Sequence, residues 1–161
     1  MNTIFEGKHV LVIERDGWEF VERKNGKEAV AVIALTDDEE LILVEQYRRP
    51  VDARVIDLPA GLVGDDGEND PARTAAKELQ EETGFIAGEV RFIAKCPTSP
   101  GITSEQVSFY RALRVHGAAK PEEGIGVHLV PRARIAAWLR EKSSLIDVKV
   151  WTALYFVAQS T

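Results

Sequence analysis

Glu78, Glu81 and Glu82 fall within five consecutive positions, and they are the residues of this chain best suited to bind a divalent metal ion. On a helix, the carboxylates of Glu78 and Glu82 would project as neighbours one turn apart, while Glu81 would point further round. Two carboxylates at this spacing repel each other unless a cation lies between them. Hard oxygen ligands suit Mg²⁺ or Mn²⁺, and these ions commonly act on phosphates. A solvated acidic face, with Lys77 paired to Glu81, is the alternative interpretation.

The sequence around the glutamates encodes both ends of a helix. Asp70 can cap the first free amides. Pro71 suits the first helical position because an N–H there would make no hydrogen bond within the helix, so proline loses nothing by lacking one. Gly84 can close the helix in the left-handed conformation. Between these ends, small apolar residues recur at helical spacing: Ala72, Ala75, Ala76 and Leu79. This narrow stripe predicts a helix that packs closely against a flat surface, such as a sheet.

Apolar runs before and after this helix predict strands. The predicted strands are residues 9–14, 18–23, 29–35, 40–45, 90–95 and 106–115. Asp16-Gly17 indicates a hairpin, and Asn25-Gly26 indicates the next turn. Two helices are predicted near the end of the chain, at residues 132–142 and 148–158. This order of strands, helix, strands and helices predicts an α+β fold.

Whole-chain properties exclude several classes of protein. A length of 161 residues with 45% hydrophobic content predicts a single domain, and a net charge of −6 argues against general binding to nucleic acid. No apolar run approaches the roughly 20 residues of a membrane span, and no basic-then-apolar leader is present, so we expect no membrane contact. One cysteine, Cys96, excludes an internal disulfide. A cytoplasmic protein is therefore expected.

The acidic helix and the loop before it resemble the Nudix box, whose pattern is G-x5-E-x7-R-E-U-x-E-E-x-G-U with U an apolar residue. Residues 77–85, KELQEETGF, match its second half with Lys77 in the arginine position. The first half is looser, because six residues rather than five separate Gly61 from Glu68, and eight rather than seven separate Glu68 from Lys77. Both extra residues fall in the loop or at the helix entry, so the register of the glutamates is kept.

The resemblance implies a Nudix-type α/β/α sandwich, in which a mixed sheet lies between helices, with an N-terminal extension of antiparallel strands. It implies one Nudix domain over residues 1–161, with residues 28–161 as the catalytic core. Residues 1–27 would form strands that are exchanged in a homodimer.

Three further segments are similar to the Nudix subgroup that hydrolyses ADP-ribose and related nucleoside-diphosphate sugars. These are residues 18–23 (WEFVER), 44–50 (VEQYRRP) and 99–101 (SPG), and Pro100 follows Gly84 by sixteen positions. The resemblance implies metal-dependent hydrolysis of a nucleotide-sugar pyrophosphate to a nucleoside monophosphate and a sugar phosphate. A GDP-mannose-preferring hydrolase and a nucleotide-sensing module without catalysis are the alternatives.

The resemblance also assigns roles to residues of this chain. Glu78, Glu82 and Glu81, with the Ala60 carbonyl, would hold Mg²⁺ or alternatively Mn²⁺, and Glu81 could also assist catalysis. Arg48, and less directly Arg49, would contact phosphate. The general base would come from the acidic loop that holds Glu122 and Glu123. The remaining candidates for substrate contact are Trp18, Phe20, Pro100, Gly101 and Glu105.

Overall fold

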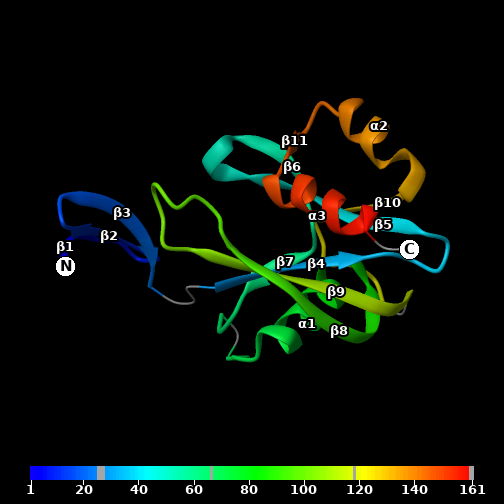
Figure 1. Ribbon diagram of the computed structural model, residues 1–161, viewed down its shortest axis with the longest axis horizontal. Helices are drawn as coiled ribbons and strands as arrows, with labels where there is room; N and C mark the ends of the chain where they lie inside the picture. Colours follow the sequence, from blue (N-terminus) through cyan, green and yellow to red (C-terminus); the bar gives the residue numbers. More distant parts are fainter. Residues whose placement is uncertain (25–27, 66, 118, 160–161) are drawn as a thin grey trace.

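The computed structural model describes residues 1–24, 28–65, 67–117 and 119–159. Three antiparallel strands come first: β1 (Asn2–Glu6), β2 (Val10–Arg15) and β3 (Trp18–Arg23). They form a small sheet that projects to one side of the main body (Figure 1). Asp16 and Gly17 join β2 to β3 with φ angles of 53° and 81°, so the predicted hairpin is confirmed. The predicted turn at Asn25-Gly26 lies outside the described residues.

Two four-stranded sheets build the main body. One has the order β7-β4-β9-β8 and the other the order β10-β5-β6-β11. The strands of the first are β4 (Glu28–Ala34), β7 (Ala60–Leu62), β8 (Phe85–Pro97) and β9 (Gln106–Gly117). Those of the second are β5 (Glu40–Arg48), β6 (Ala53–Asp57), β10 (Gly126–Pro131) and β11 (Leu145–Ile146). The sheets are mixed, because β4 pairs parallel with β9 and β11 parallel with β6, whereas the other pairs are antiparallel.

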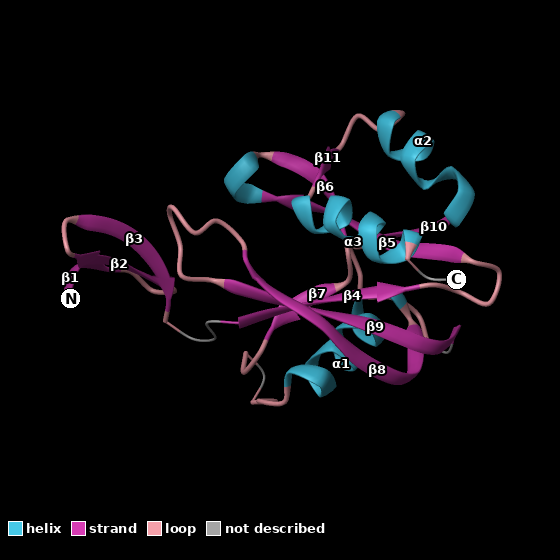
Figure 2. Cartoon of the chain, in the orientation of Figure 1, coloured by secondary structure: helices cyan, strands magenta, loops and turns pink. Residues whose placement is uncertain are grey.

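Helices cover both sides of this body (Figures 1 and 2). Helix α1 (Pro71–Thr83) lies on one side, and α2 (Ile135–Arg140) and α3 (Val148–Ala158) lie on the other. Two short 3₁₀ turns complete the elements, η1 (Arg49–Val51) and η2 (Arg132–Arg134). Among the described residues, no helix combines the length and apolar character needed to cross a membrane.

After Glu28, strand β4 is apolar, and both of its faces are buried from Val30 to Ala34. Its residues Val30 and Val32 pack with Leu79 of α1 in one cluster. Its residues Ala31 and Ile33 belong to a second cluster, on the side of α3. The small residues of α1 therefore let the acidic helix lie close to the sheet, as their spacing predicts.

The sequence predicts most element boundaries closely. Strand β3 and helices α1 and α3 occupy the predicted residues. Several boundaries differ from the prediction. His9 lies in a bend before β2 and not in a strand. Strand β8 begins at Phe85, directly after α1 and five residues earlier than predicted. The helix predicted for residues 132–142 is a 3₁₀ turn followed by α2, which ends at Arg140.

Candidate active site

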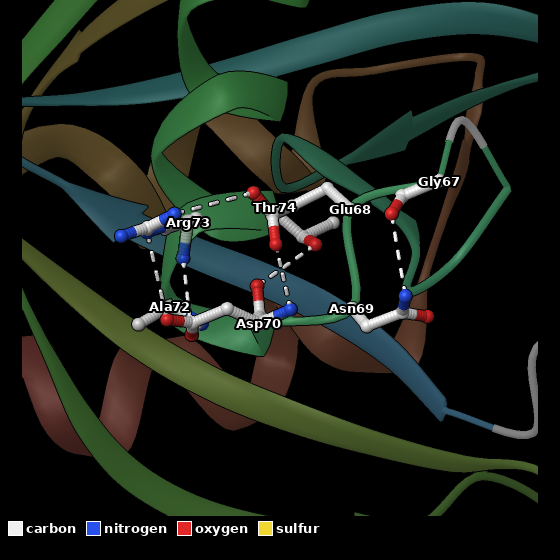
Figure 3. Close-up of polar contacts among 7 residues, drawn as sticks. All are labelled: Gly67, Glu68, Asn69, Asp70, Ala72, Arg73 and Thr74. Carbon is white, nitrogen blue, oxygen red and sulfur yellow. Dashed lines mark hydrogen bonds and ion pairs between the residues drawn. The ribbon is translucent and has the colours of Figure 1, made fainter.

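The loop before α1 is held by its own side chains (Figure 3). Asp70 Oδ1 accepts hydrogen bonds from the amides of Ala72 at 2.9 Å and Arg73 at 3.5 Å, which confirms the predicted N-cap. Glu68 Oε1 accepts from the Asp70 amide at 2.9 Å, and its Oε2 lies 4.0 Å from Nη1 of Arg73. Glu68, the first glutamate of the motif, therefore connects the loop to the first residues of the helix.

Glu78 and Glu82 lie against Ala60 and Gly61, the first two residues of β7. Glu82 is 7% exposed, and its Oε2 accepts a hydrogen bond from the Ala60 amide at 3.0 Å. The carboxylate of Glu78 lies against Gly61, where a Cβ would come within 2.6 Å of Oε2 and still nearer to Oε1. Gly61 is thus required for close approach, because any side chain there would displace the Glu78 carboxylate. One turn of α1 and the start of β7 together form an acidic wall.

The pKa of Glu82 is raised to about 7, chiefly by burial and also by the negative charges of Glu78 and Asp57. The Ala60 amide and the Arg48 guanidinium oppose this increase. A divalent cation between the two carboxylates would offset their repulsion. The arrangement therefore favours a bound cation, and its oxygen donors suit a hard ion.

The donor set is small. Within the described part of the chain, no three His, Cys, Asp or Glu side chains converge as a metal site. The fit to a cation consequently rests on Glu78, Glu82 and main-chain oxygen at Ala60. That set is compatible with Mg²⁺, which proteins often bind through one or two carboxylates while the ion keeps water or substrate phosphate.

A pocket of about 590 Å³ adjoins this wall and is lined by positively charged side chains from other elements. Arg48, the last residue of β5, lines it together with Ala60 and Gly61. Arg48 Nη2 lies 3.7 Å from Oδ2 of Asp57, the residue that ends β6. Lys149, in the first turn of α3, approaches the same oxygen at 3.0 Å. Arg48 and Lys149 therefore line a cavity that also reaches Ala60 and Gly61, the two residues that Glu82 and Glu78 contact.

Sequence reasoning did not single out Asp57 or Lys149. Asp57 directly precedes the LPAG segment. Its carboxylate at the end of an apolar strand was the feature of the sequence that could have identified it as a site residue. Lys149 lies far from the motif in sequence and reaches the pocket only because β11 pairs with β6. Arg49, the weaker phosphate candidate, starts η1 and is exposed there.

The other acidic candidates lie near the pocket or at the end of α1. Glu81 is about half exposed and forms an ion pair with Lys77 at 3.1 Å, as the alternative interpretation of the acidic face expected. Glu105 lines the pocket and pairs with Arg23 of β3. The Glu122 amide donates to the Glu81 carbonyl at 2.9 Å, which anchors the acidic loop to the last turn of α1. Glu122 and Glu123 are exposed on this loop.

A second pocket, of about 460 Å³, lies between β3 and the loop that joins β8 to β9. Trp18, Phe20, Pro100 and Gly101 line it, so four of the substrate candidates come together. The β3 strand touches this loop directly, because the Val21 amide donates to the Ile102 carbonyl at 2.8 Å. Arg23 and Glu105, on the same two segments, reach the first pocket. The two pockets are thus neighbours across β3.

Comparison with known proteins identifies the family. The sequence model of the NUDIX domain matches residues 26–148. The chain belongs to the Nudix family. The Nudix fold is also supported by a solved structure described as ADP compounds hydrolase, with a TM-score of 0.76 and 21% identity, which covers 98% of this chain and 89% of that one. At this identity the likeness concerns the fold alone, and it confirms the α+β sandwich.

Curated relatives of this Nudix protein have several names. The chain is 39% identical over 99 residues to the methanol dehydrogenase activator of Bacillus methanolicus, covering 62% of this chain and 51% of the relative. It is 38% identical over 119 residues to the ADP-ribose pyrophosphatase of Bacillus subtilis, covering 68% and 61%. It is 38% identical over 94 residues to the ADP-ribose pyrophosphatase of Mycobacterium tuberculosis, covering 58% and 45%. The matches span about half to three fifths of these relatives.

Proposed function

We propose that this Nudix protein hydrolyses the pyrophosphate bond of ADP-ribose or a related nucleoside-diphosphate sugar, and releases a nucleoside monophosphate and a sugar phosphate. One observation carries the proposal. The Glu78 and Glu82 carboxylates contact Gly61 and Ala60 at the start of β7, and these two residues line a pocket together with Arg48. The names of the relatives from B. subtilis and M. tuberculosis support the substrate class.

The proposed cofactor is Mg²⁺, with Mn²⁺ as the alternative. Glu78, Glu82 and the Ala60 carbonyl would hold it, and Glu81 could join them if it left its ion pair with Lys77. When bound, such an ion neutralises phosphate charge and lowers the pKa of a coordinated water. The buried position of Glu82 suits this role, because a buried carboxylate interacts more strongly with a cation than an exposed one does.

The other residues would bind and orient the substrate. A pyrophosphate diester carries two negative charges, and the Arg48 guanidinium can pair with its oxygens from the pocket wall. Trp18 and Phe20 offer aromatic rings for a base in the neighbouring pocket, next to Pro100 and Gly101. Glu122 and Glu123 both remain candidates for the general base, because their loop is attached to the helix that carries Glu82.

We also propose that residues 1–27 form a dimerisation element, while residues 28–161 form the catalytic core. The three-stranded N-terminal sheet supports this division because it stands beside the main body and leaves large apolar side chains exposed, among them Ile4, Phe5 and Trp18. Such a cluster is typical of a surface that contacts a partner. A monomeric mass in solution under active conditions would contradict the homodimer. The cytoplasmic location stays a prediction.

The function is tested by incubating the purified protein with Mg²⁺ and a panel of ADP-ribose, GDP-mannose, other nucleotide sugars and nucleoside triphosphates. We expect release of a nucleoside monophosphate from ADP-ribose or a close analogue, and loss of the activity with excess EDTA. Preference for GDP-mannose would favour the first alternative. Binding of nucleotide sugars without release of monophosphate would favour the sensing module. Turnover of triphosphates alone would contradict the proposal.

A further inference from the structure

Asp57 is the most buried carboxylate near the proposed active site, with 1% of its surface exposed. Its Oδ1 accepts a hydrogen bond from the Leu58 amide at 2.8 Å. Its Oδ2 faces two cations, with Lys149 Nζ at 3.0 Å and Arg48 Nη2 at 3.7 Å. A buried carboxylate requires compensating charge, so the two cations compete for one oxygen.

Lys149 is held in this position by the fold around it. Strand β11 pairs parallel with β6, and the Asp147 amide donates to the Ile56 carbonyl at 2.9 Å. Asp147 then caps α3 by accepting from the Lys149 amide at 2.9 Å. The Lys149 ammonium lies between Asp57 and Asp147, 2.9 Å from Asp147 Oδ1, and its side chain is 18% exposed. The start of α3 is therefore fixed to β6, the strand that precedes Ala60 and Gly61 in the chain.

Lys149 and Arg48 differ in how available their charged groups are to a ligand. Lys149 is largely enclosed and has two carboxylate partners, whereas the Arg48 side chain is 44% exposed and its contact with Asp57 is long for an ion pair. An arginine that made a close two-pronged pair with a buried carboxylate would have fewer donors left for phosphate. Because Lys149 supplies the nearer positive charge, Arg48 keeps its guanidinium available to the pocket.

We propose that Lys149 is a positioning residue for the pyrophosphate substrate, which acts by occupying Asp57 and so leaving Arg48 available to bind phosphate. This inference rests on the proposed function, since Arg48 binds phosphate only if the pocket takes such a substrate. Lys149 lies one position beyond the matched NUDIX segment, which ends at residue 148.

The test measures KM and kcat for ADP-ribose with Mg²⁺ in Lys149→Met, Lys149→Arg, Arg48→Ala and the Lys149→Met/Arg48→Ala double variant. We expect Lys149→Met to raise KM by about tenfold with a smaller change in kcat, because the substrate is bound less well. Lys149→Arg should restore most of the loss, since arginine also pairs with Asp57. The double variant should match Arg48→Ala alone, because Lys149 acts through Arg48.

Lys142→Met is the matched control, because Lys142 lies over the Trp138 ring, away from Asp57, and should leave KM unchanged. Urea denaturation shows whether each variant is folded. A purely structural Lys149 would lower stability without raising KM, or would give effects that multiply with those of Arg48→Ala. Either result overturns the inference.

A binding measurement separates this inference from the proposed function. Calorimetric titration with α,β-methylene ADP-ribose reports affinity without turnover. If the wild-type protein binds it but hydrolyses no nucleotide sugar, the proposed function fails, while weaker binding by Lys149→Met still supports the inference. If the wild-type protein is active and Lys149→Met has unchanged KM and affinity, only the inference about Lys149 fails. Absence of both turnover and binding in the wild-type protein overturns both.

Discussion

The carboxylate of Glu78 occupies the space that a Cβ atom would take on Gly61. This relationship joins the middle of α1 to the second residue of β7, and sixteen residues of the sequence lie between the two. Gly61, the glycine of the LPAG segment, is therefore needed because it has no side chain, and not because it can adopt unusual backbone angles. Gly61 is not among the glycines with positive φ, so the constraint is space alone.

Replacing Gly61 with alanine should therefore harm activity more than stability. The new methyl group would push aside the end of a flexible glutamate side chain, which can rotate away at a cost of about 1 kcal/mol or less. We expect a loss of at least tenfold in kcat/KM and a higher Mg²⁺ requirement, because Glu78 would no longer lie beside Glu82. Steady-state kinetics at varied Mg²⁺ and urea denaturation measure the two effects.

Gly117→Ala is the matched control for Gly61→Ala. Among the described residues, an added Cβ at Gly117 would meet Phe85 Cε1 at 3.7 Å, an ordinary van der Waals contact. Its activity should remain close to that of the wild type. Full activity in Gly61→Ala would show that the position of the Glu78 carboxylate beside Gly61 is unimportant for the reaction.

Glu82→Gln tests the proposed metal ligand with little change in shape. Its side-chain oxygen can still accept from the Ala60 amide, so the fold should be retained. Replacing a residue that supports a metal ligand typically weakens binding or activity by 10–100-fold, so removal of a direct ligand should reduce kcat by at least about 100-fold. Turnover should be compared with Glu141→Gln, which changes an exposed glutamate. Wild-type turnover in Glu82→Gln would contradict the metal role.

The sequence predicted the parts of the site that lie on one continuous element. Asp70, the glutamates and Gly84 define α1 because capping and helical spacing are local properties. Lys149 could not be assigned in this way, because its place beside Asp57 depends on the pairing of β11 with β6, across about ninety residues of chain. The same limit applied to the second pocket. The shared face of Trp18 and Phe20 follows from strand periodicity, whereas the pocket that they line together with Pro100 depends on tertiary packing.

The N-cap of α1 provides a prediction about stability. Asp70→Ala removes the acceptor for the Ala72 and Arg73 amides, so the free energy of unfolding should fall by about 1 kcal/mol. Activity should fall little while the protein is folded, because α1 remains packed against the sheet. Urea denaturation measures the change, and Asp65→Ala, an exposed position in the same loop, is the control. Equal stability of the two variants would show that the cap contributes little.

A network around Glu45 of β5 predicts how stability depends on pH. Its carboxylate accepts from Ser144 Oγ at 2.6 Å and from Arg54 Nε at 3.0 Å, and it lies 2.8 Å from His128 Nε2. The Ser144 hydroxyl, with smaller contributions from His128 and Arg54, lowers the pKa of Glu45 from 4.5 to about 2 despite partial burial. The network connects β5, β6, β10 and the segment before β11.

Because this pKa is lower in the folded than in the unfolded chain, the folded state binds fewer protons between pH 4.5 and about pH 2. The stabilisation by ionised Glu45 is complete above pH 4.5 and is lost as the pH falls through about 2. The shift corresponds to at most about 3 kcal/mol, and solvent around the half-exposed Arg54 reduces this value.

Glu45→Gln should therefore lower the free energy of unfolding at pH 6 by roughly 1 to 3 kcal/mol and reduce its decline between pH 5 and pH 3. Urea denaturation at a series of pH values measures both effects, with Glu141→Gln as the control for loss of one exposed carboxylate. Glutamine can still accept from Ser144 and Arg54, so the loss reflects charge more than lost hydrogen bonds. A pH profile parallel to that of the wild type would show that Glu45 is not the group that links protonation to stability.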